Sequence, residues 1–369
     1  MSLVVRAISS QTHEDFIQST DAHVSFLQLP QWGQVKVGWK PESIGFFKNS
    51  RLVGVALVLY RPIPKLPQRS LAYIPEGPVI GGSDTDVSEW TSALISHVKS
   101  RGAFQIKIGP PVAVAQWNAD TVKAAIAQGN ARECVSDLPP DRTFPDDSKV
   151  VSELQQQGWT QESSDGAGFG DVQPRFVFQV PLAGRSPKDI LAGFNQQWRR
   201  NIRKAEKSGV VVRLGTRADL PAFHSVYVET AQRDGFTPRG LIYFERMWDA
   251  LGEHLTLHVA EYEEHVAAAT IMVTVNKHAW YSYGASTTAD RDVRPSNALQ
   301  WHMIKTAGDL GCDTYDLRGI SNTLDPDNHL FGLINFKLGS GGYVQEYVGE
   351  WDFDIRKLWA RAFAWYQKR

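Results

Sequence analysis

The chain has 369 residues, 42% of them hydrophobic, which is enough for two domains with cores of ordinary size. Its 39 basic and 40 acidic side chains give a net charge of −1, so any attraction to a polyanion has to be local. The longest apolar run, 52–60, is too short to span a bilayer, and the first residues lack the apolar segment of a secretory signal. Cys134 and Cys312 are isolated, which argues against a zinc site or a disulfide framework and fits a cytoplasmic protein.

The first half of the chain predicts a helix, three strands, a second helix and a fourth strand. In chain order these elements occupy residues 13–19, 43–48, 52–60, 70–74, 87–100 and 103–108. Asn49 and Ser50 are typical of a tight turn between the first two strands. The segment 139–174 that follows has the composition of loops around one short helix, and we expect the lowest order there.

The second half repeats this order. Helices are predicted at 226–235, 243–252, 297–310 and 330–338, and strands at 255–264, 265–276, 278–286, 314–320 and twice within 343–351. Helices, a three-strand meander, helix, strand, helix and strand form the layout of the GNAT-like N-acyltransferase fold. The predicted fold class is therefore α/β (α+β) with two GNAT-like domains.

A basic helix is predicted at Trp198–Gly209, with the sequence WRRNIRKAEKSG. Its spacing places five cations on one face: Arg199, Arg200, Arg203, Lys204 and Lys207. Gly209 stands where a left-handed helix cap is expected. The cations form either an ordinary solvated face or a surface for a polyanion such as nucleic acid or a phosphorylated substrate.

The sequence gives weak support to an acyl-CoA site. Such a site needs a glycine-rich turn before a helix, where backbone N–H groups meet the pyrophosphate. The segment 285–297 has no glycine, and the glycines of 74–86 are followed by acidic residues. Three cations, Lys36, Arg239 and Lys337, lie among aromatic residues and glycines, and each is either a site residue or a solvated surface side chain.

The chain contains, in order, QLPQWGQVKVGWK, LAYIPEGPV, WRRNIRKAEKSGV, ETAQRDGF, YSYGAS, SNALQW, YDLRGI and FKLGSGGYVQEYVGE. From about Phe26 to Trp351 these motifs resemble the Fem family of bacterial peptidoglycan-bridge aminoacyltransferases. The resemblance implies a first GNAT-like domain at 1–174 plus 350–369 and a second at 175–349. Some family members carry a long helical-hairpin arm in the second domain, but no such arm is expected here, because the basic helix runs directly into the strand VVVRL.

The resemblance implies an activity and its partners. The activity is transfer of an amino acid from aminoacyl-tRNA to the stem-peptide amine of a peptidoglycan precursor, which forms the interpeptide bridge. The precursor is either UDP-MurNAc-pentapeptide or lipid II, and a lipid-linked precursor allows peripheral membrane association without a transmembrane segment. Because the tRNA ester is already activated, neither a cofactor nor a metal is expected.

Site residues follow from the same resemblance. Lys36 and Arg239 are similar to diphosphate-binding cations, and the substrate-contacting tyrosines are Tyr73, Tyr243 and Tyr283. Lys337, beside Phe336, is similar to the cation that meets the tRNA end and stabilises the charge developing during acyl transfer. The five cations of the basic helix are expected to bind tRNA.

The chain departs from the family pattern at Gly109, where many members carry an acidic residue before the proline. No general base is assigned for this reason. Two alternatives stay open, an acyl-CoA-dependent N-acyltransferase of small molecules and a non-catalytic RNA-binding module.

Overall fold

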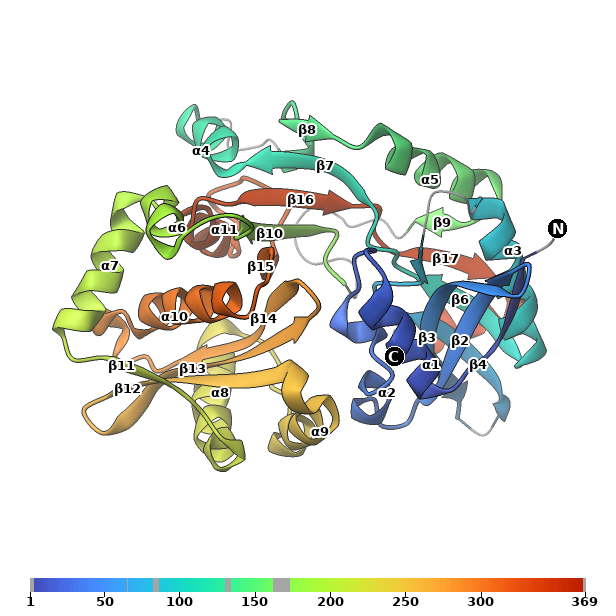
Figure 1. Cartoon of the computed structure of the whole chain (residues 1–369), viewed down its shortest axis with the longest axis horizontal. Coiled ribbons are helices and arrows are strands. Elements are labelled where there is room, and N and C mark those ends of the chain that lie inside the picture. Colours follow the sequence, from blue (N-terminus) through green and yellow to red (C-terminus); the bar gives the residue numbers. More distant parts are fainter. Residues whose placement is uncertain (1–2, 65, 82–85, 130–133, 162–172, 368–369) are drawn as a thin grey trace. The chain divides into compact units, whose positions relative to one another are not determined.

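The computed structural model describes residues 3–64, 66–81, 86–129, 134–161 and 173–367 (Figure 1). The chain forms two compact units: the first comprises 1–115, 142–175 and 346–369, and the second 116–141 and 176–345. The expected first domain included 116–141, which lies in the second unit. Part of the loop segment 139–174, which was expected to have the lowest order, lies outside the described residues, namely 162–172.

The first unit is built on one mixed sheet. Its helices are α1 (Ser10–Ser19), η1 (Phe26–Gln28), α2 (Trp32–Val35), α3 (Val87–Ser100), α5 (Pro145–Gln156) and α12 (Lys357–Gln367). Its strands are β1 (Val4–Ala7), β2 (Lys40–Lys48), β3 (Arg51–Ile63), β4 (Leu66–Ile74), β5 (Val79–Ile80), β6 (Ala103–Ile108), β9 (Thr160–Gln161) and β17 (Trp351–Asp354). The strand order is β1-β2-β3-β4-β6-β17-β9, and β5 pairs with β3.

Local sequence signals explain these elements. Asn49 and Ser50 have φ of 52° and 64°, the left-handed pair that a two-residue hairpin requires, so the predicted turn is confirmed. Asp86 caps α3 by accepting a hydrogen bond from the N–H of Ser88 at 2.6 Å. The helix then buries Leu94 and other apolar residues in the core of this unit.

The second unit holds most of a second sheet. The remaining helices are α4 (Ala119–Ala127), η2 (Val135–Asp137), α6 (Pro187–Gly193), α7 (Gln196–Lys207), η3 (Arg217–Asp219), α8 (Leu220–Asp234), α9 (Leu241–Leu251), η4 (Gly252–His254), η5 (Arg291–Val293), α10 (Pro295–Asp309) and α11 (Phe331–Leu338). The remaining strands are β7 (Ala113–Asn118), β8 (Arg142–Thr143), β10 (Phe176–Pro181), β11 (Val211–Leu214), β12 (Leu255–Tyr262), β13 (His265–Val275), β14 (His278–Ser286), β15 (Thr314–Gly319) and β16 (Tyr343–Tyr347). The strand order is β11-β12-β13-β14-β15-β10-β16-β7-β8. The predicted meander is confirmed as β12, β13 and β14.

Each unit contains one parallel pair next to its meander, β4 with β6 and β14 with β15. In the second unit this pairing runs only from His278–Thr314 to Trp280–Asp316, although β14 continues to Ser286. Beyond Trp280, β14 and β15 no longer pair with each other. Helices α8 and α10 pack on the meander, and Figure 1 shows them on opposite sides of these strands.

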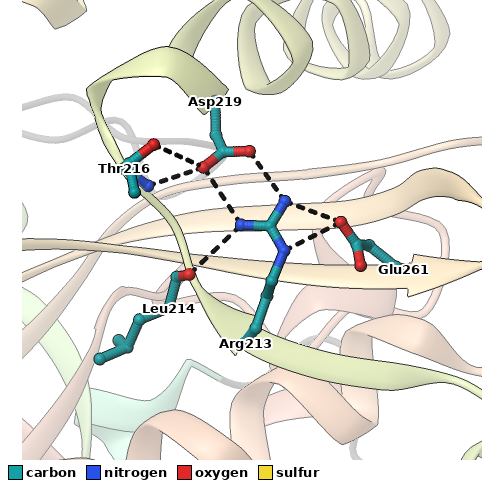
Figure 2. Close-up of polar contacts among 5 residues, drawn as sticks. All are labelled: Arg213, Leu214, Thr216, Asp219 and Glu261. Carbon is teal, nitrogen blue, oxygen red and sulfur yellow. Dashed lines mark hydrogen bonds and ion pairs between the residues drawn. The ribbon is translucent and has the colours of Figure 1, made fainter.

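A polar network fastens the edge strand β11 to the turn that follows it (Figure 2). The Arg213 guanidinium donates to Asp219 at 2.8 and 3.1 Å and to Glu261 of β12 at 2.7 and 2.9 Å. Asp219 also accepts from the N–H of Thr216 at 2.7 Å, which completes a capping box for η3. These contacts lower the pKa of Asp219 to about 2, chiefly through its hydrogen bonds with Arg213.

Within the described ranges, none of the helices is both long enough and apolar enough to cross a membrane.

Candidate functional site

Lys337 lies in the last turn of α11 and is only 4% exposed. Its ammonium donates hydrogen bonds to the backbone carbonyls of Arg318 (3.3 Å) and Gly319 (2.5 Å) at the end of β15. Burial lowers the pKa of Lys337 to about 7, while the charge of Asp316 opposes this shift and that of Arg318 adds to it. The interpretation of Lys337 as a solvated surface lysine is therefore wrong.

A buried carboxylate organises the backbone that receives Lys337. Asp316 on β15 accepts hydrogen bonds from Gln179 Nε2 (3.1 Å) and the N–H of Arg318 (2.5 Å), and His278 Nε2 lies 3.4 Å away. Burial alone would raise the pKa of Asp316, but the hydrogen bond and charge of His278, with Arg318 and Gln179, hold it below its usual range. Arg318 has a left-handed φ of 63°, a strained conformation of the kind that concentrates at functional sites.

Helix α7 packs against the residue next to Lys337. The indole N–H of Trp198 donates to the Phe336 carbonyl at 2.8 Å, and the two ring centroids are 4.8 Å apart. A Cβ atom at Gly339 would stand 2.2 Å from the Trp198 ring, so only glycine fits there. The glycine run after Lys337 thus permits the close approach of the Trp198 side chain.

The predicted basic helix is confirmed as α7, and Gly209 follows it with a left-handed φ of 87°. Its buried face consists of Trp198, Ile202 and Ala205. Four of the five cations are exposed: Arg200, Arg203, Lys204 and Lys207. The fifth, Arg199, is half-buried and donates to the carbonyl of Ala192 at 2.8 Å.

Two of the predicted substrate tyrosines meet in an aromatic cluster of the second unit. The hydroxyls of Tyr243 on α9 and Tyr283 on β14 are 2.9 Å apart. Phe244 packs edge-on against both rings, with centroid distances of 5.4 and 5.2 Å. Burial and the neighbouring Tyr283 raise the pKa of Tyr243, so its hydroxyl stays neutral at neutral pH.

Arg239 is exposed and adjoins this cluster. Its guanidinium carbon lies 5.4 Å from the centre of the Tyr243 ring, a cation–π contact. His224 Nε2 donates to the Arg239 backbone carbonyl at 3.1 Å, which fixes the loop before α9. The structure thus joins Arg239, Tyr243 and Tyr283, which the resemblance had grouped as substrate contacts.

In the first unit, Lys36 directly follows α2 and is half-buried. Its ammonium lies 5.5 Å from the centre of the Trp32 ring. The loop before it is anchored by buried Gln28, which donates to the Pro75 carbonyl at 2.6 Å and accepts from the N–H of Leu57 at 2.9 Å. The motif QLPQWGQVK therefore holds the backbone that carries Lys36.

Tyr73, the third predicted tyrosine, stands near the end of β4 and is 5% exposed. Its hydroxyl donates to the carboxylate of Glu350 at 2.6 Å, and Glu350 is itself 1% exposed. Burial and the negative charge of Glu350 raise the pKa of Tyr73 well above its usual value.

Glu350 was missed by the sequence analysis, and it lies beside the position where the family pattern is broken. A Cβ atom at Gly109 would be 3.3 Å from the Glu350 Cγ atom. The carboxylate of Glu350 thus stands next to the place where many family members carry an acidic side chain. Its motif, GYVQEYVGE, was noted, but nothing in the sequence alone brings residue 350 to residue 109.

Comparison with known proteins agrees with this architecture. The FemAB family matches residues 8–265 and 260–368 of the chain. A curated relative, the lipid II:glycine glycyltransferase of Staphylococcus epidermidis, is 27% identical over 420 aligned residues, which cover 95% of this chain and 92% of that protein.

Two solved structures show the fold. The crystal structure of FemX gives a TM-score of 0.79 at 23% identity and covers 97% of this chain and 99% of its own. A tandem GNAT protein from the clavulanic acid pathway gives 0.51 at 10% identity, covering 96% and 99%. The predicted fold class of two GNAT-like domains is confirmed. Since α7 ends at Lys207 and β11 begins at Val211, the hairpin arm is also missing from this fully described stretch, as expected. By the family match over nearly its whole length, the chain belongs to the FemAB family.

Proposed function

We propose that this protein transfers an amino acid from aminoacyl-tRNA to the stem-peptide amine of a peptidoglycan precursor and so builds the interpeptide bridge. Membership of the FemAB family and the likeness to a lipid II:glycine glycyltransferase support this activity. The name of that relative favours lipid II over the soluble UDP-linked precursor. The observation that carries the proposal is the buried ammonium of Lys337, aimed at two carbonyls beside an exposed basic helix.

The reaction defines what the site has to supply. The acceptor amine attacks the ester carbonyl, a carbon–nitrogen bond forms, and the carbonyl oxygen becomes an oxyanion. The intermediate then expels the ribose oxygen of the tRNA, which takes up a proton while the amine loses one. A positive donor near the developing oxyanion lowers the barrier. We assign that role to Lys337, whose ammonium is largely shielded from water.

We assign proton transfer to Glu350. Its carboxylate is buried, is oriented by the Tyr73 hydroxyl, and lies next to Gly109, where other members supply an acidic group. A carboxylate has several acceptor positions on its two oxygens, so one that accepts from Tyr73 can also take a proton from the acceptor amine.

Recognition of the two substrates is assigned to cations and aromatic groups. Lys36 and Arg239 contact the phosphates of the precursor, and Tyr243 and Tyr283 contact its organic part. The exposed cations of α7 contact the phosphates of the tRNA acceptor arm. Because α7 packs on Phe336 through Trp198, tRNA bound along α7 lies in the neighbourhood of Lys337.

The test is a transfer assay with purified protein. A mixture of labelled amino acids charged on tRNA is offered with lipid II or with UDP-MurNAc-pentapeptide, and labelled acetyl-CoA is offered in parallel. We expect label from tRNA, and none from acetyl-CoA, in the precursor, more in lipid II than in the soluble form. Label from acetyl-CoA instead would establish an acyl-CoA-dependent enzyme. Binding of tRNA without any transfer would establish an RNA-binding module.

A further inference from the structure

Helix α12 has an outward face with large exposed apolar side chains. Its inward face is built into the first unit: Phe363 packs on Phe104 with ring centroids 5.3 Å apart, and Ala360 is buried with it. On the outside, Leu358 is 82% exposed and Trp365 is 59% exposed. Such large exposed fractions for a leucine and a tryptophan on one short helix require an explanation.

The exposed residues form a single stripe. Leu358, Arg361, Ala362 and Trp365 are spaced i, i+3, i+4 and i+7, and all four are exposed. The stripe is therefore apolar along its length and carries one guanidinium within it. A face of this kind suits a boundary between water and an apolar medium, where tryptophan rings and arginine stems are both favoured.

The charged residues in the segment that contains the stripe are all basic. The segment 355–369 contains five cations, Arg356, Lys357, Arg361, Lys368 and Arg369, and has no acidic residue, although the whole chain has a net charge of −1. Arg61 is also exposed, and its guanidinium carbon lies 5.9 Å from the centre of the Phe363 ring of α12. The surface of α12 is thus complementary to a negatively charged partner.

The placement of two of these cations disfavours the helix itself. Lys357 is the first residue of α12 and Arg356 precedes it, and the first turn contains no acidic residue. Cations at the positive end of a helix dipole are unfavourable. A sequence that breaks this rule twice in succession is consistent with an external anion that offsets the repulsion.

We propose that α12 lies flat on an anionic lipid bilayer, with Leu358, Ala362 and Trp365 entering the interface and the cations facing lipid phosphates. An exposed Trp–Leu stripe in a segment whose charged residues are all basic favours a bilayer over a protein partner, whose contact would combine both signs of charge. This contact holds the first unit at the membrane surface, where a lipid-linked precursor resides. Vesicle binding is measured without precursor or tRNA, so its outcome is independent of the proposed transfer reaction.

The test is co-sedimentation of the full chain with vesicles. One set is phosphatidylcholine alone, and the other contains about one-third phosphatidylglycerol to supply the anionic charge. We expect binding to the anionic vesicles only, with release at high salt because the attraction is screened. Replacing Lys357 and Arg361 with Gln should lower the partition coefficient about fivefold per cation.

Apolar variants distinguish vesicle binding through the stripe from non-specific adsorption of exposed apolar side chains. L358S/W365S should lower the partition coefficient at least about tenfold. A matched control, I242S/L310S, removes two side chains that are 56% and 57% exposed on the second unit and should bind as the parent does. L358S alone repeats the test if the double variant melts at a lower temperature.

Three results would overturn the proposal. The first is equal binding to neutral and anionic vesicles, and the second is equal loss of binding in the control pair. The third is a change of oligomeric state in L358S/W365S with vesicle binding unchanged, which would make the stripe a contact with a second copy.

Discussion

A lysine that is 4% exposed and donates hydrogen bonds to two carbonyls has lost most of its hydration. Replacing Lys337 with Met keeps the length and apolar stem and removes only the ammonium. We expect Lys337→Met to lower kcat by about 10²–10³, the usual effect of losing one oxyanion donor, with little change in KM. Steady-state kinetics with charged tRNA measure both constants. Near-normal kcat in a folded variant would contradict the assigned role.

The lowered pKa of Lys337 predicts a pH dependence with a defined sign. An ammonium stabilises an oxyanion only while protonated, so kcat/KM should fall as the pH rises through about 7. An independent measure is stability: the folded state binds fewer protons than the unfolded state between about 7 and 10.5, so the free energy of unfolding should rise with pH there. This rise should be missing in Lys337→Met. An activity that instead increases through pH 7 would mean that neutral Lys337 is a base.

Glu350 is tested by an isosteric change. Glu350→Gln keeps the hydrogen bond from Tyr73 and removes the proton acceptor, so kcat should fall by about 10²–10⁴ while precursor binding persists. Asp354→Asn is the matched control, because it makes the same chemical change on an exposed residue at the end of β17. Equal kinetics for the two variants would remove Glu350 from the mechanism.

At single residues, the sequence suggests a chemical role but does not reveal the environment of the side chain. Lys337 was predicted as a site residue from its neighbouring aromatic residues and glycines, but its burial depends on β15, which is brought to α11 only by the fold. Glu350 was missed for the same reason: its partners Tyr73 and Gly109 are far away in the chain, and no local period links them.

Helix α7 yields a test of the polyanion surface. Replacing Arg203, Lys204 and Lys207 with Gln should weaken tRNA binding and reduce the slope of log K against log salt by about two to three, since each phosphate contact contributes roughly 0.7–0.9. Filter binding over a salt series measures this. The control replaces Lys188, Arg246 and Lys277, three exposed cations of the same unit, with Gln. If both triple variants change the slope equally, α7 is an ordinary solvated face.

The network that joins β11 to η3 predicts acid sensitivity. Because the pKa of Asp219 is lowered to about 2, its contribution is present above the unfolded value near 4 and is lost as the pH falls toward 2. Near pH 6, Asp219→Asn should cost about 1–2 kcal/mol, a figure reduced because Arg213 is 38% exposed. Urea unfolding should show this difference shrinking below about pH 4. A difference that stays constant with pH would contradict the charge-based account.

Elements with clear periodicity were predicted closely. The strand at 103–108 and the helix at 87–100 have the predicted bounds, and β14 spans the predicted 278–286. The elements β7, α4, β10 and α6 were not predicted. Strand β10 is buried on both faces between β15 and β16, so it lacks the alternation that marks an exposed strand.

For the whole molecule, repetition of element order was enough to predict two GNAT-like domains. The domain limits were harder to place, because the chain passes between the two units after residues 115, 141, 175 and 345. Periodicity describes local structure and contains no information about which unit a strand joins. The segment 116–141 illustrates this, since it follows first-unit elements directly and belongs to the second.

The interior position of β17 has a consequence for synthesis on the ribosome. In the first sheet β17 lies between β6 and β9. The edge of β6 that faces away from β4 therefore has no partner strand until residues 351–354 have been translated. At about 5–20 residues per second, the interval from the end of β6 to β17 takes roughly 12–50 s. The N-terminal unit therefore completes its sheet only after the second unit has emerged, and a premature stop codon near residue 346 would leave the earlier-made unit incomplete.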